Sequence, residues 1–167
     1  AYVMQNMKKF IYRQQIKPSD IEVIADMVES SGFFSDEEIE IAIELAEDKL
    51  DKQEVSSYQF LFAEIENQVV GYTCYGLIPA TAGSYDLYWI VVAKDLQGLG
   101  VGKMLMAETE NRIYQNGGRQ IYAETSSRAQ YTPTHKFYES CGYAKEAFLK
   151  NFYSEGDGKI IYAKVLK

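Results

Sequence analysis

Gln97-Gly98-Leu99-Gly100-Val101-Gly102 follows an apolar run, residues 87–92, and precedes a segment with helical periodicity. A strand that leads through a glycine-rich turn into a helix forms an anion site. The glycines let backbone N–H groups approach the ligand closely, and the helix dipole adds partial positive charge. This stretch therefore predicts a binding site for a phosphate or pyrophosphate group.

Two common phosphate-binding motifs fit the glycine turn poorly. A P-loop needs Ser or Thr after Gly102-Lys103, but Met104 follows, so the hydroxyl that would bind Mg²⁺ is missing. A dinucleotide-binding GxGxxG motif would place its last glycine one residue after Gly102. Neither nucleotide-binding motif accounts for the turn.

The turn is instead similar to motif A of the GCN5-related N-acetyltransferase (GNAT) family, [Q/R]xxGx[G/A]. Gln97-x-x-Gly100-x-Gly102 matches that signature and comes after a strand ending in Ile90-Val91-Val92. Further on, Phe137-Tyr138-Glu139-Ser140-Cys141-Gly142-Tyr143 resembles the family's FYExxGF element, in the expected order and spacing. The resemblance covers about residues 9–166. It implies a single-domain α/β fold of the acyl-CoA N-acyltransferase type, with a mixed, mostly antiparallel sheet flanked by helices.

The same resemblance implies acetyl-CoA as co-substrate and assigns its binding residues. In the family, pantetheine pairs with the strand before the glycine turn, and the pyrophosphate accepts hydrogen bonds from the N–H groups of the turn. The residues expected to contact the cofactor are Ile90, Val91, Val92, Gln97, Gly98, Leu99, Gly100, Val101, Gly102 and Lys103.

Acetyl transfer to an amine needs a base for the amine and an acid for the leaving thiolate. Tyr138 is the candidate acid, because a phenol with an ordinary pKa of about 10 is protonated at neutral pH. Glu124, at the end of the strand 120–125, is the candidate base, and Asp86 on the strand 85–92 is its rival. Cys74 and Cys141 have no histidine placed to activate them, so direct transfer is favoured over a covalent intermediate.

The position of Glu124 resembles that of the catalytic glutamate in bacterial acetyltransferases of ribosomal-protein N-termini. Those proteins also carry an aromatic loop similar to the segment 151–158, which contains Phe152 and Tyr153. The chain departs from them at Tyr131, where they have a cofactor-contacting asparagine, and in a longer segment that includes Ser126-Ser127-Arg128. Close kinship of substrate is therefore in doubt.

The acceptor is the least defined partner. An α-amino group is about 10–15% neutral at pH 7, whereas a lysine-type amine is only about 0.04% neutral. A single carboxylate base such as Glu124 can deprotonate an α-amine more easily than a lysine-type amine. This favours a peptide N-terminus or an amino-acid-like molecule as the acceptor. A polyamine or aminoglycoside is the alternative, and a non-catalytic acyl-CoA-binding sensor is a third. The sequence does not give the oligomeric state.

Composition fits one globular domain, placed at residues 9–167 behind an N-terminal extension, residues 1–8. We expect a cytoplasmic protein, because no apolar run could cross a membrane, no signal peptide is visible, and two cysteines suit a reducing compartment. A single histidine, His135, argues against a histidine-rich metal site, and we expect no metal. The net charge of −7 argues against a nucleic-acid partner.

The negative charge is concentrated between Asp20 and Glu54, where 13 acidic residues stand beside two lysines. One interpretation is a pair of solvated helix faces. The other is a negative surface that attracts a cationic acceptor by electrostatic steering.

Periodicity and turn residues predict the order of the elements. Capping boxes Ser19-x-x-Glu22 and Ser35-x-x-Glu38 open the first two helices, and Thr132-Pro133 opens the last. Strands are expected at 10–16, 58–66, 69–78, 85–92, 120–125, 143–149 and 159–166, with helices at 19–32, 35–50, 100–116 and 132–141 and a hairpin turn at Asn67-Gln68.

Overall fold

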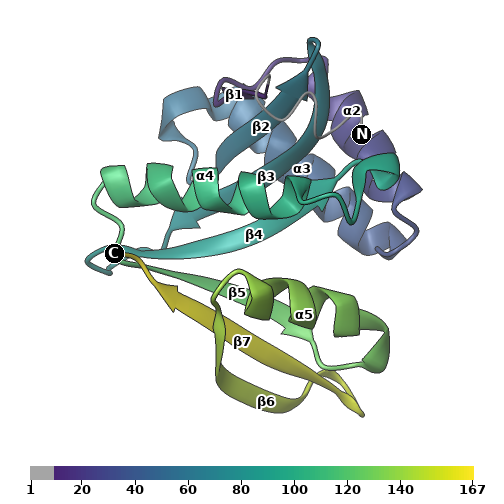
Figure 1. Ribbon diagram of the computed structural model, residues 1–167, viewed down its shortest axis with the longest axis vertical. Coiled ribbons are helices and arrows are strands. Elements are labelled where there is room, and N and C mark those ends of the chain that lie inside the picture. The colour runs from purple at the N-terminus through teal and green to yellow at the C-terminus, as the bar shows by residue number, and fades with distance from the viewer. Residues whose placement is uncertain (1–9) are drawn as a thin grey trace. The chain divides into compact units, whose positions relative to one another are not determined.

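The computed structural model describes residues 10–167 (Figure 1), so the predicted extension 1–8 lies outside the described residues. The elements follow the predicted order. They are β1 (Ile11–Arg13), α2 (Asp20–Ser30), α3 (Asp36–Lys52), β2 (Gln59–Ile65), β3 (Gln68–Leu77), β4 (Ser84–Val92), α4 (Val101–Gln115), β5 (Gln120–Ser126), α5 (Thr132–Ser140), β6 (Ala144–Ser154) and β7 (Asp157–Val165), with short 3-10 turns η2 (Gln53–Val55), η3 (Lys94–Leu96) and η4 (Ala129–Tyr131).

In the described part of the chain, seven strands are hydrogen-bonded in the order β1-β2-β3-β4-β5-β7-β6. β4 and β5 run parallel, whereas β1–β2, β2–β3, β5–β7 and β6–β7 are antiparallel. The predicted mixed, mostly antiparallel sheet flanked by helices is therefore confirmed. The ladder between β4 and β5 joins Ser84–Leu87 to Gln120–Ala123, and β4 continues beyond it to Val92.

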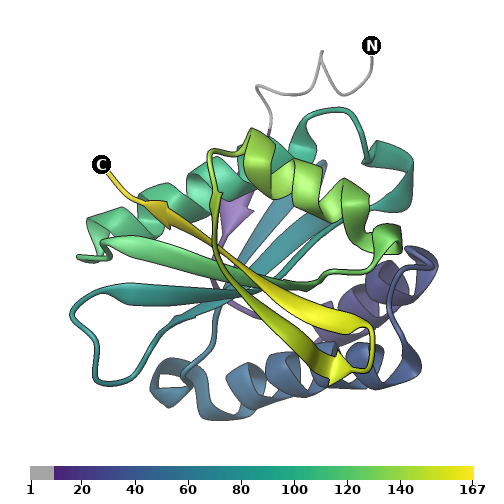
Figure 2. The ribbon, with the colours of Figure 1, turned by 90° about the horizontal axis from the view of Figure 1, so that it is seen from below.

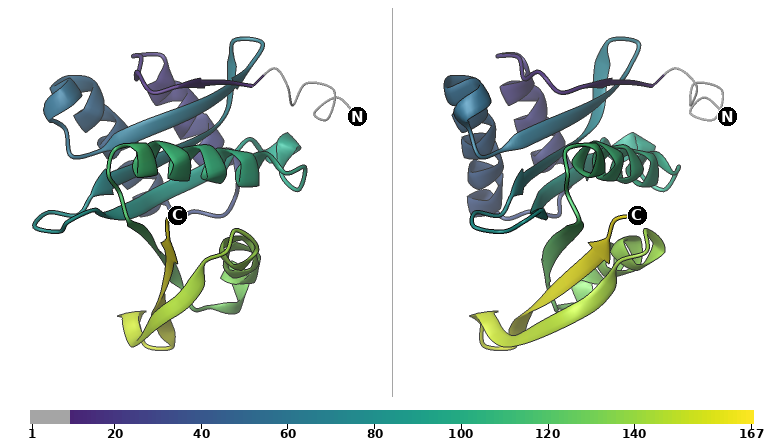
Figure 3. Two further views of the ribbon diagram at one scale, coloured as in Figure 1. Left: turned by 60° about the vertical axis from the view of Figure 1, so that its left-hand side comes forward. Right: turned by 90° about the vertical axis from the view of Figure 1, so that its left-hand side faces the viewer.

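By their contacts the described residues form two compact units, and β4 and α4 each contribute to both. The first runs to Gly76 and includes Trp89–Thr109. Within it α2 and α3 cover one face of β2 and β3, and α4 lies on the other face (Figure 3). The core beneath α2 and α3 is a stack of aromatic rings, Phe60, Phe62 and Tyr72, with centroids 5.8–6.1 Å apart. Burying such large rings supplies much of the hydrophobic stabilisation.

The two predicted capping boxes have opposite outcomes. At Ser35 the box is confirmed: its side chain accepts from the Glu38 N–H, and Glu38 accepts in return from the Ser35 N–H. At Ser19 the prediction is wrong, because Ser19 already has helical dihedral angles and its side chain makes no capping bond. The Asp20 carboxylate instead accepts from the Lys17 N–H at 2.7 Å and binds the Arg13 guanidinium.

The second unit comprises Leu77–Tyr88 and Glu110–Lys167. Within it α5 lies along β5 and β7, and β6 and β7 form a long hairpin (Figure 2). Side chains alternate between the two faces of the strands. Along β5, Ala123 and Thr125 are buried and Glu124 between them is exposed. On the face beneath α5, Tyr138 packs against Tyr162 of β7, with ring centroids 5.5 Å apart.

Several element boundaries differ from the sequence predictions. The β2–β3 turn is Glu66-Asn67, both with positive φ, one residue earlier than predicted. β1 is shorter than predicted. The prediction of Thr132 as N-cap and Pro133 as first helical residue of α5 is wrong, because the N-cap is Tyr131 and Pro133 is the second residue of the helix. β6 extends to Ser154, with an irregular register against β7 between Leu149 and Ser154, so the predicted aromatic loop is mostly strand. No helix in residues 10–167 is long and apolar enough to cross a membrane.

Candidate functional site

The glycine turn has the backbone geometry that its sequence predicts. Gly98 and Gly100 have φ of +77° and +87°, a region that is unfavourable for residues with a Cβ. Within residues 10–167, no heavy atom apart from those of the glycine and its two chain neighbours lies within 4 Å of the place where either Cβ would stand, so the turn is open to a ligand. The Gln97 side chain donates to the carbonyl oxygen of Val92 at 3.2 Å, which ties the turn to the end of β4.

The start of α4 supplies free amide groups next to this turn. The Met104 N–H donates to the Gly100 carbonyl at 3.2 Å and so closes the first helical turn. The amides of Val101, Gly102 and Lys103 precede that bond and have no acceptor within the helix. Together with the helix dipole, these groups form a cradle for an anion. The residues fit the pyrophosphate of acetyl-CoA.

The apolar end of β4 leads directly into the cradle. Val91 is buried, and Ile90 and Val92 are half-buried. These three residues lie beyond Leu87, the last residue of β4 in the ladder with β5. The predicted cofactor residues therefore lie on β4 and on the glycine turn, with the short turn η3 between them in the chain. Their contact with a cofactor stays a prediction.

Two carboxylates lie where the β4–β5 ladder stops. Asp86 and Glu124 directly neighbour the last paired residues, Leu87 and Ala123, in sequence. Burial raises the pKa of Asp86 above its ordinary value, and the Glu124 carboxylate raises it further. The Lys159 ammonium acts in the opposite direction. The two candidate bases therefore interact with each other and belong to one cluster.

Lys159 is a residue of this cluster that sequence reasoning missed. Its Nζ lies 2.7 Å from Glu124 Oε2, and its side chain is only 12% exposed, compared with 45% for Glu124. Its Nζ also lies 3.7 Å from the ring centroid of Phe152. Only the register of β7 against β5, which pairs Ser126 with Lys159, brings the lysine beside Glu124. No sequence pattern encodes that register, so no signal in the sequence could have found Lys159.

Tyr138 lies on the other face of the β5–β7 strands from this cluster. Its ring packs on Tyr162, which pairs with Ala123, whereas Glu124 points to the opposite face. Burial raises the pKa of Tyr138 well above its ordinary value, and the neighbouring Cys141 and Tyr162 add to the shift. The Tyr138 phenol therefore keeps its proton throughout the neutral and mildly alkaline range, and its role as proton donor stays a prediction.

The loop after β5, which contains Ser127 and Arg128, is held by Asp157. This carboxylate accepts from the Ser126 hydroxyl and pairs with Arg128 at 3.3 Å. The single histidine, His135, contacts the Ser126 carbonyl oxygen through Nε2 at 2.7 Å. Tyr131 immediately precedes α5 as its N-cap residue. These contacts tie the loop to β7 and α5.

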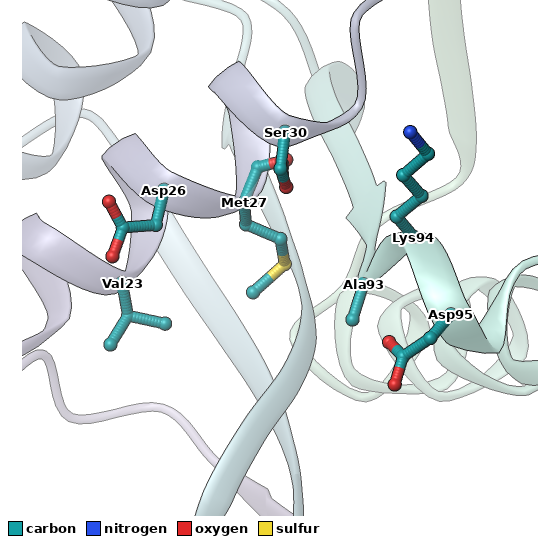
Figure 4. Close-up of a pocket in the computed structure, with 7 residues that line it drawn as sticks. All are labelled: Val23, Asp26, Met27, Ser30, Ala93, Lys94 and Asp95. Carbon is teal, nitrogen blue, oxygen red and sulfur yellow. Dashed lines mark hydrogen bonds between the residues drawn. The ribbon is translucent and has the colours of Figure 1, made fainter.

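A surface hollow of about 640 Å³ lies between α2 and the segment that follows β4 (Figure 4). Val23, Met27 and Ala93 give it apolar walls. Asp26 stands on one side, and Lys94 and Asp95 stand on the other (Figure 4). The hollow is therefore a partly apolar depression with mixed charges.

Comparison with known proteins assigns the family. The acetyltransferase (GNAT) domain family matches residues 56–145, which is more than half of the chain. The chain therefore belongs to the GNAT family of N-acetyltransferases. A GNAT-family protein from Desulfovibrio desulfuricans has a solved structure with 44% sequence identity and a TM-score of 0.90, and the match covers 95% of this chain and 99% of that one.

An uncharacterised N-acetyltransferase of Methanocaldococcus jannaschii is 30% identical over 105 residues, or 63% of this chain. The chain spans 65%, just under two thirds, of the length of that relative.

Two further structures share the fold at lower identity. An aminoglycoside 6′-N-acetyltransferase in complex with coenzyme A is 18% identical, with a TM-score of 0.74 and coverage of 94% and 97%. The ribosomal-protein-S18-alanine N-acetyltransferase of Escherichia coli is 15% identical, with a TM-score of 0.70 and coverage of 95% and 94%. Members of this fold thus bind coenzyme A and act on different amines.

Proposed function

We propose that this protein transfers the acetyl group of acetyl-CoA directly to a primary amine, the α-amine of a peptide N-terminus or of an amino-acid-like molecule. The observation that carries the proposal is the pair of interacting carboxylates, Asp86 and Glu124, beside the point where the β4–β5 ladder stops. Such a pair can bind an ammonium group and accept its proton. The anion cradle at the start of α4 supports the choice of co-substrate.

The cradle residues, Gly98 to Lys103, would hold the pyrophosphate, and Ile90, Val91 and Val92 would lie along the pantetheine. When bound, acetyl-CoA supplies the thioester carbonyl that the amine attacks. The coenzyme A complex of the aminoglycoside 6′-N-acetyltransferase supports this choice of ligand.

Three proton transfers complete the reaction in this proposal. Glu124 accepts a proton from the acceptor ammonium, directly or through a water molecule, and the neutral amine forms the new C–N bond as the C–S bond breaks. Tyr138 donates its phenolic proton to the departing sulfur, and the second proton lost by the nitrogen as it becomes an amide restores the Tyr138 phenol, directly or through water. Asp86 is the rival base, because its pKa is raised toward neutral pH, which makes it a stronger base than an ordinary aspartate.

The cysteines support direct transfer. Burial raises the pKa of Cys74 well above its ordinary value, so its sulfur stays a thiol and a poor nucleophile. The carbonyl of Cys141 accepts from the Lys164 ammonium at 2.8 Å, and the backbone around Cys141 ends α5. These contacts hold the Cys141 backbone, and His135, the one histidine of the sequence, contacts the Ser126 carbonyl oxygen, so the proposal is direct transfer with no acetylated enzyme.

A polyamine or aminoglycoside acceptor is the second candidate. It is favoured by the acidic helices α2 and α3, and Asp26 of α2 is one of the residues that line the hollow. Negative charge on such a surface raises the rate at which polycations reach it.

One assay tests the proposal and separates the candidates. Release of free thiol from acetyl-CoA is measured with a panel of N-terminal peptides, amino-acid amides, polyamines and aminoglycosides. We expect turnover, with peptides or amino-acid amides giving the highest kcat/KM. Thiol release with polyamines alone would favour the second candidate, and binding of acetyl-CoA without turnover of any amine would favour a sensor.

A further inference from the structure

The Lys159 ammonium occupies a place that resembles a binding site for a cationic amine. Its Nζ lies 2.7 Å from Glu124 Oε2, 3.7 Å from the ring centroid of Phe152 and 5.9 Å from that of Tyr153. A carboxylate and aromatic faces are the groups by which proteins bind ammonium ligands. The cluster therefore already contains one ammonium group, supplied by the chain itself.

The charge of the cluster follows from the groups that the strands bring together. Asp86 comes from β4, Glu124 from β5, Lys159 from β7 and the phenol of Tyr153 from β6. Counted by formal charge, two carboxylates and one ammonium give the cluster a net charge of −1. One acceptor ammonium neutralises the cluster, and a second ammonium on the same molecule would leave it positive.

We propose that Lys159 is a specificity-determining residue that makes this site select acceptors with a single positive charge. This inference rests on the proposed function, in which the acceptor meets Glu124. Because Lys159 is mostly buried and already paired with Glu124, it stays in place and repels a second ammonium that approaches the carboxylates. Lys159 thereby disfavours polyamines, although the acidic helices would attract them.

The size of the effect follows from Coulomb's law. Removal of Lys159 changes the cluster by one unit charge at a distance of several ångströms from the acceptor's second ammonium. In the partly exposed environment of Glu124, such a change alters the ratio of kcat/KM for a doubly charged acceptor to kcat/KM for a singly charged acceptor by about tenfold. The effect should weaken at high salt, because exposed charges are screened.

The test uses two tripeptide amides that differ only at position two, Gln in one and Lys in the other. Both share the same α-amine, so the ratio of their kcat/KM values reports the effect of one added charge. In the wild-type enzyme the Lys peptide should be no better than the Gln peptide. In Lys159→Gln the ratio of Lys peptide to Gln peptide should rise about tenfold. Lys159→Arg keeps the charge and should preserve the wild-type ratio.

Lys136→Gln is the matched control, because Lys136 is an exposed residue of α5 and its replacement changes the net charge equally. It should leave the ratio unchanged. A wild-type preference for the Lys peptide or for spermidine would overturn the inference, even if the Lys159 variants did not fold. An equal ratio in wild type and folded Lys159→Gln would overturn it as well. Absence of turnover with every amine would instead overturn the proposed function.

Discussion

Replacement of Gly100 tests whether the glycine turn binds the pyrophosphate of the co-substrate. Gly100 has φ of +87°, and its Cβ position is open. Asn and Asp tolerate this backbone region better than other residues with a Cβ. Gly100→Asn and Gly100→Asp therefore carry similar backbone strain and nearly the same volume. The only large difference between the two variants is the negative charge.

The expected loss of affinity follows from that charge. An Asp carboxylate at this position would stand beside the free amides of Val101, Gly102 and Lys103, where the phosphates would accept hydrogen bonds. At about 6 Å in a partly exposed site, repulsion between two like charges is on the order of 1–2 kcal/mol. This corresponds to about a tenfold or larger increase in the Kd for coenzyme A, since 1.4 kcal/mol is one factor of ten.

Titration calorimetry with coenzyme A measures the effect. Gly100→Asn should lose only a small part of the wild-type affinity, and Gly100→Asp should lose at least tenfold more. The difference between the variants should shrink at high salt. Equal Kd values for folded Asn and Asp variants would refute the idea that an anion binds at this turn.

Three further perturbations test the catalytic groups and the fold. Tyr138→Phe should lower kcat by roughly 10²-fold with little change in the Kd for acetyl-CoA. Because burial raises the pKa of Tyr138, the wild-type pH–rate profile should show no alkaline limb from this residue between pH 8 and about 10. If the kcat of Tyr138→Phe stays within about twofold of the wild-type value while chemistry is rate-limiting, another group donates the proton to the sulfur. Glu124→Gln should lower kcat/KM mostly at low pH, where the amine is protonated, and Asp86→Asn should not. If Asp86 is the base, Glu124→Gln should instead move the acidic limb to lower pH, because loss of a like charge lowers the pKa of Asp86. Urea unfolding should give a free energy of unfolding that is lower by about 1 kcal/mol in Ser35→Ala and by less than about 0.5 kcal/mol in Ser19→Ala, because of these two serines only Ser35 caps its helix. Equal losses of free energy of unfolding in the two variants would contradict the assignment of the caps.

Local sequence patterns were sufficient where the controlling interactions are local. Ser35 and Glu38 lie one helical turn apart, so their reciprocal bonds can be recognised from spacing alone. Gly98 and Gly100 adopt positive φ because the turn between β4 and α4 requires it, and glycine is the residue that allows it at low cost. The order of strands and helices followed from the same kind of information.

Local patterns were insufficient at two places. The Ser19 box did not form, because Ser19 itself has helical dihedral angles, and the neighbouring Asp20 carboxylate accepts from the Lys17 N–H and binds Arg13. Phe152 and Tyr153 belong to β6, which extends to Ser154, although its register against β7 is irregular between Leu149 and Ser154. The tertiary context of a segment can override its local propensity.

The order of the elements, the glycine turn at Gly98 and Gly100, and membership of the GNAT family could all be recognised in the amino-acid sequence. The charged cluster of Asp86, Glu124 and Lys159 could not, because it forms only in the folded sheet. Each of the three residues comes from a different strand, and strand register depends on pairing over long distances in the chain. A turn is encoded by neighbouring residues, whereas this cluster exists only after the sheet has formed.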